Sequence, residues 1–302
     1  MTGTKDVTSQ KYLVYVLLLI TVIIWGGTFA AGKEAALGAP PLTVALWRFI
    51  LASLILCPQL AFTEGLGLKK IDLYTFVLLL LSAATGLILY NYFFIKGLAL
   101  TGAGRGSVIV TINPAFIYLG SVIFFSEKLT LIRGVGILLA ICGTLVVVTG
   151  GRISAILDGG FNIGDLILTL CIVSWTAYSL LGKLVLGRIS PLAANTFTSL
   201  LAVIMLIPLC LLAQEPLDAF LGFTYDTWLS IGFLGLLGTA LGFTFFYRGI
   251  LILGPHKAGV FISLVPFFGI LSGALVHGES IEPTVILGLL ISLAGLTIIQ
   301  KY

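Results

Sequence analysis

Two tryptophans, Trp25 and Trp175, lie deep inside long hydrophobic segments of the chain. Trp25 falls about 13 residues into its segment, which is roughly 20 Å along a helix. Tryptophans that anchor a protein at a membrane surface lie near helix ends, so both residues are too deep for that role. Thr28 follows Trp25 by three positions and Tyr178 follows Trp175 by three, so each pair shares a helix face. These faces either line a cavity for a small molecule or pack tightly in the core.

A second set of aromatic and polar side chains follows helical spacing. Thr239, Phe243 and Tyr247 lie four positions apart and form a stripe on one helix face. Tyr90 and Asn91 occupy the corresponding stretch of the first half of the chain. An asparagine amide exposed to lipid is costly, so Asn91 must face other helices or water. Its role is therefore either to line a cavity or to form a hydrogen bond between helices.

Two prolines, Pro114 and Pro266, fall inside hydrophobic segments at matching places in the two halves. Proline lacks a backbone N–H and leaves a carbonyl without its helical partner, so each predicts a break or a kink. Breaks at membrane depth are tolerated only against protein or a water-filled cavity. Asn113 and Ser263, close to the two prolines, would supply polar groups there. We expect Pro114 and Pro266 to act as hinges, with a purely architectural kink as the alternative.

Charged residues are rare at membrane depth. Long basic side chains reach toward the lipid headgroups by default, which is the expectation for Arg48, about six residues into its segment. Pairing of Arg48 with Glu34 or with a substrate carboxylate is the alternative. Glu127 and Glu279 each end a segment, where capping or loop pairing is expected. None of the twelve acidic residues lies at mid-depth, so proton coupling would need Glu34 or a carboxylate at a segment end.

The chain lacks the motifs that several classes of enzyme and pump need. Neither GxxxxGKS nor GxxxxGKT is present, so there is no ATP-binding loop of that type. HExxH and GxSxG sequences are also absent. The four cysteines lie inside hydrophobic segments without CxxC spacing. We therefore expect no catalytic residues, no metal site, no cofactor and no enzymatic activity.

The elements that position these residues are predicted to be membrane-spanning helices. Hydrophobic residues make up 59% of the chain and charged residues 9%, which excludes a soluble globular domain. Ten hydrophobic segments reach or approach the roughly 20 residues that cross a bilayer as a helix. We predict an all-α integral membrane protein with ten transmembrane helices. The predicted spans are 12–32, 42–62, 74–97, 102–125, 130–149, 162–186, 191–213, 227–251, 255–277 and 283–300.

The chain is predicted to consist of two repeats, residues 1–150 and residues 151–302. Residue types recur 150 positions later and, after a slip of two, 152 positions later. Each repeat carries five spans, and because five is odd the second repeat enters the membrane with reversed orientation. Such inverted repeats give a transporter a way to alternate access to a site at mid-membrane. Matched pairs include Trp25 with Trp175, Lys33 with Lys183, Phe93 with Phe245, Pro114 with Pro266, Glu127 with Glu279, and Gly143 with Gly295.

The basic residues predict how the protein sits in the membrane. With loops assigned alternately to two sides, eleven of the 16 Lys and Arg residues fall on the side of the N-terminus. The other five are Lys33, Arg48, Lys96, Arg105 and Arg152. This bias predicts cytoplasmic termini in a multi-pass protein of the inner (cytoplasmic) membrane, with its first span a retained helix rather than a signal peptide. The net charge of +4 needs no nucleic-acid partner.

Glycines in the fifth and tenth spans predict a closely packed helix pair, because small residues let helices approach in lipid. The same helix faces could instead join two copies of the chain, so both a monomer and a homodimer fit the sequence. The glycines are Gly134, Gly136, Gly143, Gly288 and Gly295.

These motifs resemble those of a known family. The run Ile24-Trp25-Gly26-Gly27-Thr28-Phe29, with Lys33 and then Arg48-Phe49, is similar to the opening of an EamA-like domain. The ends of both repeats, Pro114 to Glu127 and Pro266 to Glu279 with the glycines that follow, are similar too. Nearly the whole chain resembles a ten-helix member of the drug/metabolite transporter superfamily. The second repeat departs from the opening motif, with Ser174-Trp175-Thr176-Ala177, and has Thr198 where the first has Arg48.

The resemblance implies a 5+5 inverted repeat with cytoplasmic termini and a central cavity between the halves. Members of this superfamily export amino acids, related metabolites or drugs, and others move nucleotide sugars or phosphorylated sugars. Carried onto this sequence, with the depth arguments above, it implies a substrate-binding set. That set is Trp25, Thr28, Tyr90, Asn91, Asn113, Trp175, Tyr178, Phe243, Tyr247 and Ser263.

We therefore expect a secondary transporter that exports small amphipathic metabolites such as amino acids, by alternating access at the central cavity. Its expected partners are a small-molecule substrate and membrane lipid. A channel-like facilitator and an exchanger of sugar phosphates or nucleotide sugars are the alternatives. The aromatic-rich, carboxylate-poor depth favours neutral, cationic or aromatic solutes, since phosphate recognition would want inward-facing Arg or Lys.

Overall fold

The computed structural model describes residues 3–65, 71–151, 162–253 and 255–301, and every regular element in these ranges is a helix. Eight of the helical segments are long and apolar enough to cross a membrane, and two shorter apolar helices follow them. The eight are Tyr12–Gly38, Pro41–Thr63, Leu73–Leu98, Ala103–Phe125, Leu131–Thr149, Ile163–Leu186, Pro191–Leu212 and Tyr225–Leu253. The two shorter helices are Val265–His277 and Pro283–Ile299. The chain is therefore an all-helical, multi-pass membrane protein, as its sequence predicts.

The first two helices differ in length from their predicted spans. Helix α1 runs from Gly3 to Gly38, and α2 runs from Pro41 to Thr63. The prediction ended the first span at residue 32, which is too early. No proline interrupts the helix before Pro40 and Pro41, and Pro41 occupies the first turn of α2, where its missing N–H costs nothing.

The third and eighth spans each contain a stretch of π-helix at a matching position. The third consists of α3 (Leu73–Ser82), η2 (Ala83–Leu89) and α4 (Tyr90–Leu98). The eighth consists of α11 (Tyr225–Gly232), η5 (Phe233–Leu241) and α12 (Gly242–Leu253), after a short 3-10 segment η4 (Leu217–Gly222). Such wider turns shift the side chains that follow them, and they are frequent at functional sites.

The fourth and ninth spans are interrupted next to their prolines. The fourth consists of α5 (Ala103–Ile109), a 3-10 turn η3 (Val110–Ile112) and α6 (Asn113–Phe125). The ninth is two helices, α13 (Pro255–Ile262) and α14 (Val265–His277), which confirms the break predicted from Pro266. Pro114 and Pro266 lie in the first turn of α6 and α14, because proline lacks the N–H that an interior helical position requires.

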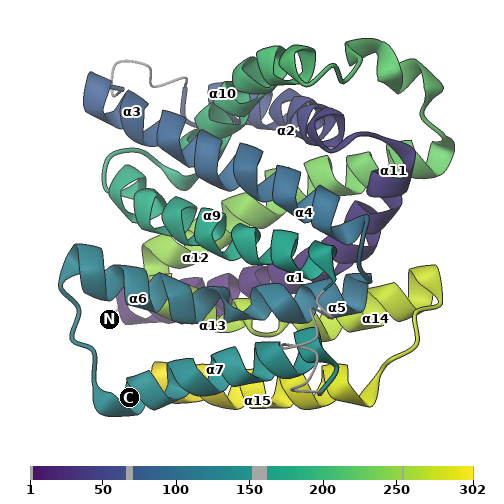
Figure 1. Cartoon of the computed structure of the whole chain (residues 1–302). Helices are drawn as coiled ribbons and strands as arrows, with labels where there is room; N and C mark the ends of the chain where they lie inside the picture. Colours follow the sequence, from purple (N-terminus) through teal and green to yellow (C-terminus); the bar gives the residue numbers. More distant parts are fainter. Residues whose placement is uncertain (1–2, 66–70, 152–161, 254, 302) are drawn as a thin grey trace.

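The remaining helices are α7 (Leu131–Thr149), α9 (Ile163–Leu186), α10 (Pro191–Leu212) and α15 (Pro283–Lys301). The helices of the two halves interleave (Figure 1). At one edge α7 packs along α15, and at the other α2 packs along α10. Between them α1 packs against α12 and α14, while α9 packs against α4 and α6. The centre of the molecule is thus built from both halves.

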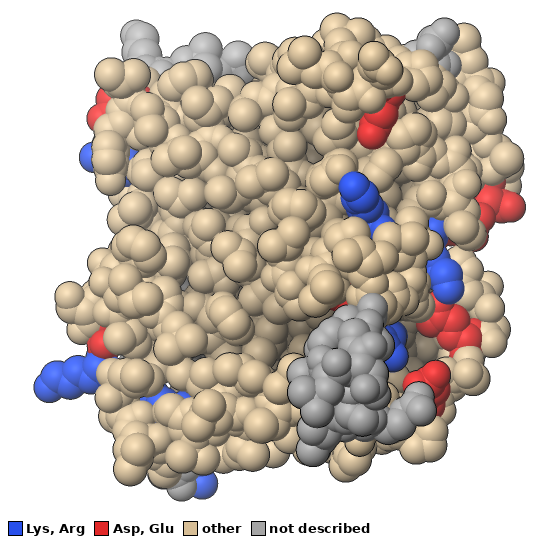
Figure 2. Space-filling model, in the orientation of Figure 1, with Lys and Arg blue, Asp and Glu red and all other residues tan. Residues whose placement is uncertain are grey.

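Charged side chains gather toward two opposite ends of the molecule, and the wide face between them is almost entirely uncharged (Figure 2). Both chain termini lie at one of these ends, on the left of Figure 1. We call this end the terminal face, which includes the turns at residues 126–130 and 187–190. The opposite face includes the turns at residues 39–40, 99–102 and 278–282. Such a surface suits a protein whose uncharged middle lies in lipid.

Reciprocal glycine contacts hold α7 against α15. A Cβ added at Gly143 would lie 2.5 Å from the Gly288 carbonyl oxygen, and one added at Gly288 would lie 2.6 Å from the Gly143 oxygen. A Cβ added at Gly136 would likewise lie 2.7 Å from the Gly295 carbonyl oxygen. These backbones approach so closely that no other residue fits without movement. Four of the five predicted glycines therefore serve a helix pair within the chain, whereas a Cβ at Gly134 would meet nothing within 4 Å.

Gly143→Leu is expected to destabilise the fold by about 1–3 kcal/mol, because the added side chain must separate α7 from α15. Gly134→Leu is the matched control, since its side chain would enter open space. Thermal unfolding of the purified protein in detergent compares the two. Equal midpoints for both variants would contradict the close packing of this helix pair.

Candidate functional site

A cavity of about 50 Å³ lies at the centre of the molecule, between helices of both halves. Its wall is largely aromatic and aliphatic, with a few polar side chains, which is the composition of many small-molecule sites. The volume accommodates one or two water molecules, so a metabolite would require the helices to move apart. The lining residues are Trp25, Thr28, Phe29, Arg48, Tyr90, Phe94, Ser107, Val110, Thr111, Asn113, Trp175, Phe243, Ile262, Val265 and Pro266.

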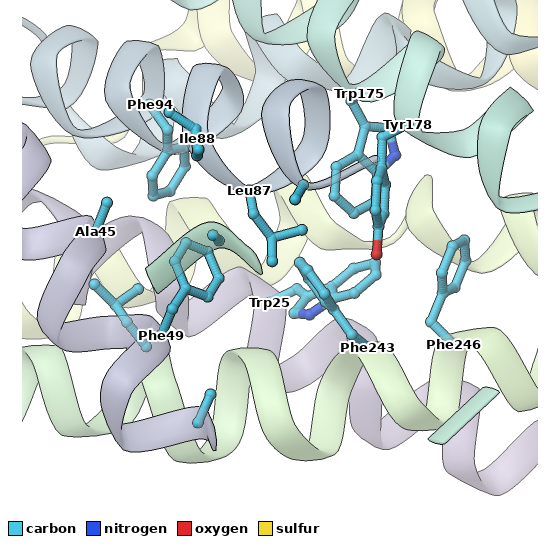
Figure 3. Close-up of a cluster of buried hydrophobic side chains, with 14 of the residues drawn as sticks. Trp25, Ala45, Phe49, Leu87, Ile88, Phe94, Trp175, Tyr178, Phe243 and Phe246 are labelled. Atoms are coloured by element: carbon cyan, nitrogen blue, oxygen red, sulfur yellow. The ribbon is translucent and has the colours of Figure 1, made fainter. Parts of the chain in front are cut away.

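The two matched tryptophans meet at this cavity. The Trp25 and Trp175 rings lie edge to face, with their centroids 5.6 Å apart. Phe243 contacts both rings, at 5.5 Å from Trp25 and 5.7 Å from Trp175. In Figure 3, Trp25 from α1 and Phe243 from α12 converge with Trp175 and Tyr178, which both come from α9. Edge-to-face packing suits the charge distribution of aromatic rings and presents flat apolar surface to the cavity.

The two tryptophans differ in their hydrogen bonding. The Trp25 Nε1 donates to the Gly238 carbonyl oxygen in η5 at 3.0 Å. The Trp175 Nε1 is buried and has no hydrogen-bond partner. The Asn113 Oδ1, also in the cavity wall, is likewise buried without a partner. Buried polar atoms normally find a partner, so a ligand that reached these two atoms would satisfy them.

Arg48 reaches the cavity wall from α2, and neutral groups on two other helices hold it. Its Nε donates to Thr239 Oγ1 at 2.8 Å, and its Nη1 donates to Asn91 Oδ1 at 2.6 Å. Thr239 lies in η5, and Asn91 lies two residues after η2. The two π-helical stretches therefore position both acceptors. Arg48 is only 4% exposed, so the expectation that its side chain reaches the headgroups was wrong.

A group of interactions lies between the cavity and the opposite face. Lys33 Nζ contacts Glu279 Oε1 at 2.6 Å, and the Glu279 carboxylate accepts the Ala103 and Gly104 N–H groups at 2.9 and 3.0 Å. We call these four residues the Lys33–Glu279 lock. The lock joins the ends of α1 and α14 to the start of α5, about one turn beyond the cavity wall. A depression of about 260 Å³ on the opposite face ends at Lys33 and Glu279.

The lock is charged at physiological pH. Burial alone would raise the pKa of Glu279, but the Lys33 ammonium and the Gly104 and Ala103 N–H groups outweigh it and hold that pKa below its ordinary value of 4.5. A carboxyl group with a lowered pKa stabilises the structure above its ordinary value and loses that contribution as pH falls through the lowered one. The Lys33–Glu279 ion pair is therefore intact at neutral pH, and it is lost by protonation of Glu279 only in acid.

The matching residues at the terminal face are not locked. Lys183 lies over the Phe125 ring at 3.9 Å, and neither it nor Glu127 has an ion-pair partner in the part of the chain that the structure describes. Glu127 instead borders a crevice of about 60 Å³ between α6, α9, α12, α13 and α15. Ile262 lines both this crevice and the central cavity. Ile262 therefore separates this crevice from the central cavity.

The EamA-like transporter family profile matches the chain twice, over residues 12–149 and 162–300. The chain belongs to the EamA-like transporter family. Among its relatives, an uncharacterized transporter of Bacillus subtilis, YyaM, is 29% identical over 260 residues, covering 85% of this chain and 84% of that protein. A relative from Streptantibioticus cattleyicolor, named a probable terminal-alkyne amino-acid exporter, is 24% identical over 285 residues, covering 94% and 92%.

A solved crystal structure has the same fold. It is 18% identical in sequence, with a TM-score of 0.66 over 93% of this chain and 94% of that chain. Relatives in this family are named as transporters rather than enzymes. Among the described residues there is also no group of three or more His, Cys, Asp or Glu that could hold a metal ion. The protein is a membrane transporter.

The cavity of this EamA-like transporter is lined by some of the predicted residues and not by others. Trp25, Thr28, Tyr90, Asn113, Trp175 and Phe243 line it, as do Arg48 and Pro266. Asn91, Tyr178, Tyr247 and Ser263 lie behind the wall. Tyr178 and Tyr247 stack on each other with centroids 5.9 Å apart, and Asn91 contacts the cavity only through Arg48. Ser263 lies in the turn between α13 and α14, and its Oγ is buried without a partner.

Glu34 plays no part in the cavity. It lies near the end of α1, with its Oε2 3.8 Å from His277 Nδ1. No described contact joins it to Arg48, so pairing with Glu34, one of the alternatives considered for Arg48, was wrong. The two residues lie on different helices and bind different partners, which a sequence separation of 14 positions does not reveal.

Some cavity residues were missed by the sequence argument. Phe29 lies one turn after Trp25, and Phe94 lies one turn after Tyr90, so helical spacing could have found both. Ser107 and Thr111 lie four positions apart in the fourth span, and both line the cavity. Nothing in their residue types separates them from ordinary small polar residues of a membrane helix.

The two tryptophans provide a matched pair of variants. Trp25→Phe and Trp175→Phe both shrink a buried ring, but only Trp25→Phe removes a hydrogen bond and leaves the Gly238 oxygen without that donor. Trp25→Phe is expected to cost about 1 kcal/mol more than Trp175→Phe in unfolding free energy. Unfolding in detergent measures this difference. A greater loss of stability in Trp175→Phe would show that its Nε1 is bonded after all.

Proposed function

We propose that this protein is a secondary transporter that exports small amphipathic metabolites such as amino acids, by alternating access at the central cavity. The observation that carries the proposal is the position of that cavity. It lies where the two halves of the chain meet, and the Lys33–Glu279 lock separates it from the opposite face. A site at mid-depth that is closed on one side is what alternating access requires.

The difference between the two faces supports this mechanism. Lys33 matches Lys183, and Glu279 matches Glu127. Lys33 and Glu279 form an ion pair, whereas Lys183 and Glu127 do not. If the halves are inverted repeats, the other transport state exchanges these arrangements. Glu127 would then bind Lys183, and Glu279 would release Lys33. We infer that in the present state the cavity is approached from the terminal face, because Ile262 borders both the cavity and the crevice at that face. The basic residues predict this face to be cytoplasmic, and such an approach suits an exporter.

The composition of the wall supports an amphipathic substrate. Trp25, Trp175 and Phe243 supply apolar surface, whereas Trp175 Nε1 and Asn113 Oδ1 supply an unused donor and an unused acceptor. A solute with an apolar body and a polar end would use both. The named amino-acid exporter among the relatives is consistent with such a solute. Pro114 and Pro266, at breaks beside the cavity, would let the wall widen around it.

The two alternative functions are less well supported. A channel needs a continuous path, and the lock closes the path toward the opposite face. A carrier of sugar phosphates needs several cations for a group of up to two negative charges. Arg48 alone carries a charge among the described residues that line the cavity.

Counterflow in proteoliposomes tests the proposal. Vesicles preloaded with unlabelled amino acids are expected to accumulate labelled amino acids transiently above the equilibrium level, because a carrier exchanges them one for one. Val110→Trp, which fills the cavity, should abolish the overshoot, whereas Val135→Trp on the exposed side of α7 should not. Equilibration without an overshoot would indicate a channel. Movement of sugar phosphates but not of amino acids would refute the proposed substrate class.

The lock should control access to the cavity from the opposite face. In a variant with the four native cysteines replaced, Val110→Cys places a thiol in the cavity wall. Glu279→Gln is expected to raise its labelling by a membrane-impermeant reagent from the opposite face about threefold to tenfold, since a part-buried ion pair worth ~1 kcal/mol is lost. Glu127→Gln makes the same change at the unlocked face and should leave this rate unaltered. Equal rates in the two variants would show that the lock is not a gate.

A further inference from the structure

Arg48 is a charged residue buried at membrane depth without a counter-charge. Its side chain lies seven residues into α2 and is 4% exposed. None of the described carboxylates pairs with it. Ionisable groups in this position are expensive in a bilayer, and they usually face a cavity or a partner. The absence of an acidic partner therefore points to an anion that arrives from outside the protein.

The neutral groups around Arg48 are oriented to hold it as a cation. Asn91 Nδ2 donates to the Leu87 carbonyl oxygen at 2.7 Å, which turns its Oδ1 toward Arg48. Thr239 Oγ1 donates to the Leu234 oxygen at 3.1 Å, which leaves a lone pair for Arg48 Nε. These hydrogen bonds thus orient both acceptor oxygens toward Arg48. They fix the guanidinium in place but do not neutralise its charge.

One edge of the guanidinium is left for a ligand. Nε and Nη1 are bonded to Thr239 and Asn91, whereas Nη2 donates to no described residue. The backbone of Gly238 runs beside Nη2, and a Cβ added there would lie 3.5 Å from it. Arg48 lines the cavity, whose other described lining residues carry no charge. The cavity therefore presents one fixed positive charge with an unused donor.

The matching position in the other half shows that the helix packing does not require this charge. Thr198 stands where the first half has Arg48, and α2 packs along α10 in the same region. The Thr198 hydroxyl bonds back to the Ala194 and Asn195 carbonyl oxygens of its own helix. A small residue thus serves the structural role on one side. The single arginine is an addition that makes the cavity suited to one negative charge.

We propose that Arg48 is the anion receptor of the cavity and selects substrates that carry one carboxylate on an apolar body. The proposal rests on the proposed function, because it takes the central cavity as the transport site. The carboxylate would receive Nη2–H of Arg48, and the apolar body would lie against Trp25 and Phe243. A cation without a carboxylate would be repelled by Arg48. A dianion would leave a negative charge buried without compensation.

Ligand binding to the full-length protein in detergent, measured by isothermal titration, tests this selectivity. The probes are 3-phenylpropanoate and its uncharged counterpart 3-phenylpropanamide, which differ little in shape. The carboxylate is expected to bind at least about tenfold more tightly than the amide, as a charge-assisted hydrogen bond predicts. Arg48→Gln should abolish that ratio while leaving amide binding intact, which shows that the cavity is still folded. Lys96→Gln, which removes an exposed cation over the Tyr92 ring, should keep the full ratio.

Two results would overturn the proposal: an Arg48→Gln protein that retains the preference, or a parent protein that shows none, including one to which the carboxylate does not bind. Arg48→Lys gives a further readout, because it keeps the charge and should restore part of the ratio. The outcome is separable from that of the proposed function. Arg48-dependent binding without amino-acid counterflow would support the receptor and reject amino-acid export. Counterflow that survives Arg48→Gln with unchanged selectivity would support amino-acid export and reject Arg48 as the anion receptor.

Discussion

Hydrocarbon offers no hydrogen-bond partner, and this constraint governs nearly every polar contact in the structure. Spanning segments must be helical, and each interruption must be satisfied by protein. The π-helical stretch η5 shows the result, since Trp25 and Asn195 donate to its carbonyl oxygens at 3.0 and 3.1 Å. The breaks beside Pro114 and Pro266 likewise lie at the central cavity rather than against lipid. Irregular backbone and cavity therefore occur together.

The kind of contact between helices separates the rigid parts of the molecule from those that could move. Helices α7 and α15 touch backbone to backbone through glycines, which leaves no room for sliding. Around the cavity, by contrast, contacts run through aromatic rings, interrupted helices and the Lys33–Glu279 lock. Ion pairs at a partly wet face can break and reform with little net cost. A transporter of this kind would therefore change state at the lock and the broken helices, with the α7–α15 pair unchanged.

The cavity combines features that would conflict in a soluble protein. Aromatic and aliphatic side chains form most of its wall, yet the wall contains an arginine without an acid, and an indole N–H and an amide oxygen without partners. A core selected for stability alone would satisfy or remove these groups. Their presence at the meeting point of both halves is consistent with the proposed substrate, which would complete them. In the two proposals, Arg48 would determine which substrates bind, and the lock would determine when the opposite face is open.

The sequence alone determined that the chain is an all-helical membrane protein of the EamA-like family, because hydrophobic length and motif residues are local properties of the chain. It also identified Trp25, Trp175 and Phe243 as candidate cavity residues, and all three line the cavity. Only the tertiary structure decided that Tyr178 and Tyr247 lie behind the wall, that Arg48 meets Asn91 and Thr239, and that Glu34 does not reach it. These outcomes depend on helix rotation and on how helices distant in sequence pack, and π-helical turns shift the periodicity from which a sequence argument infers a face.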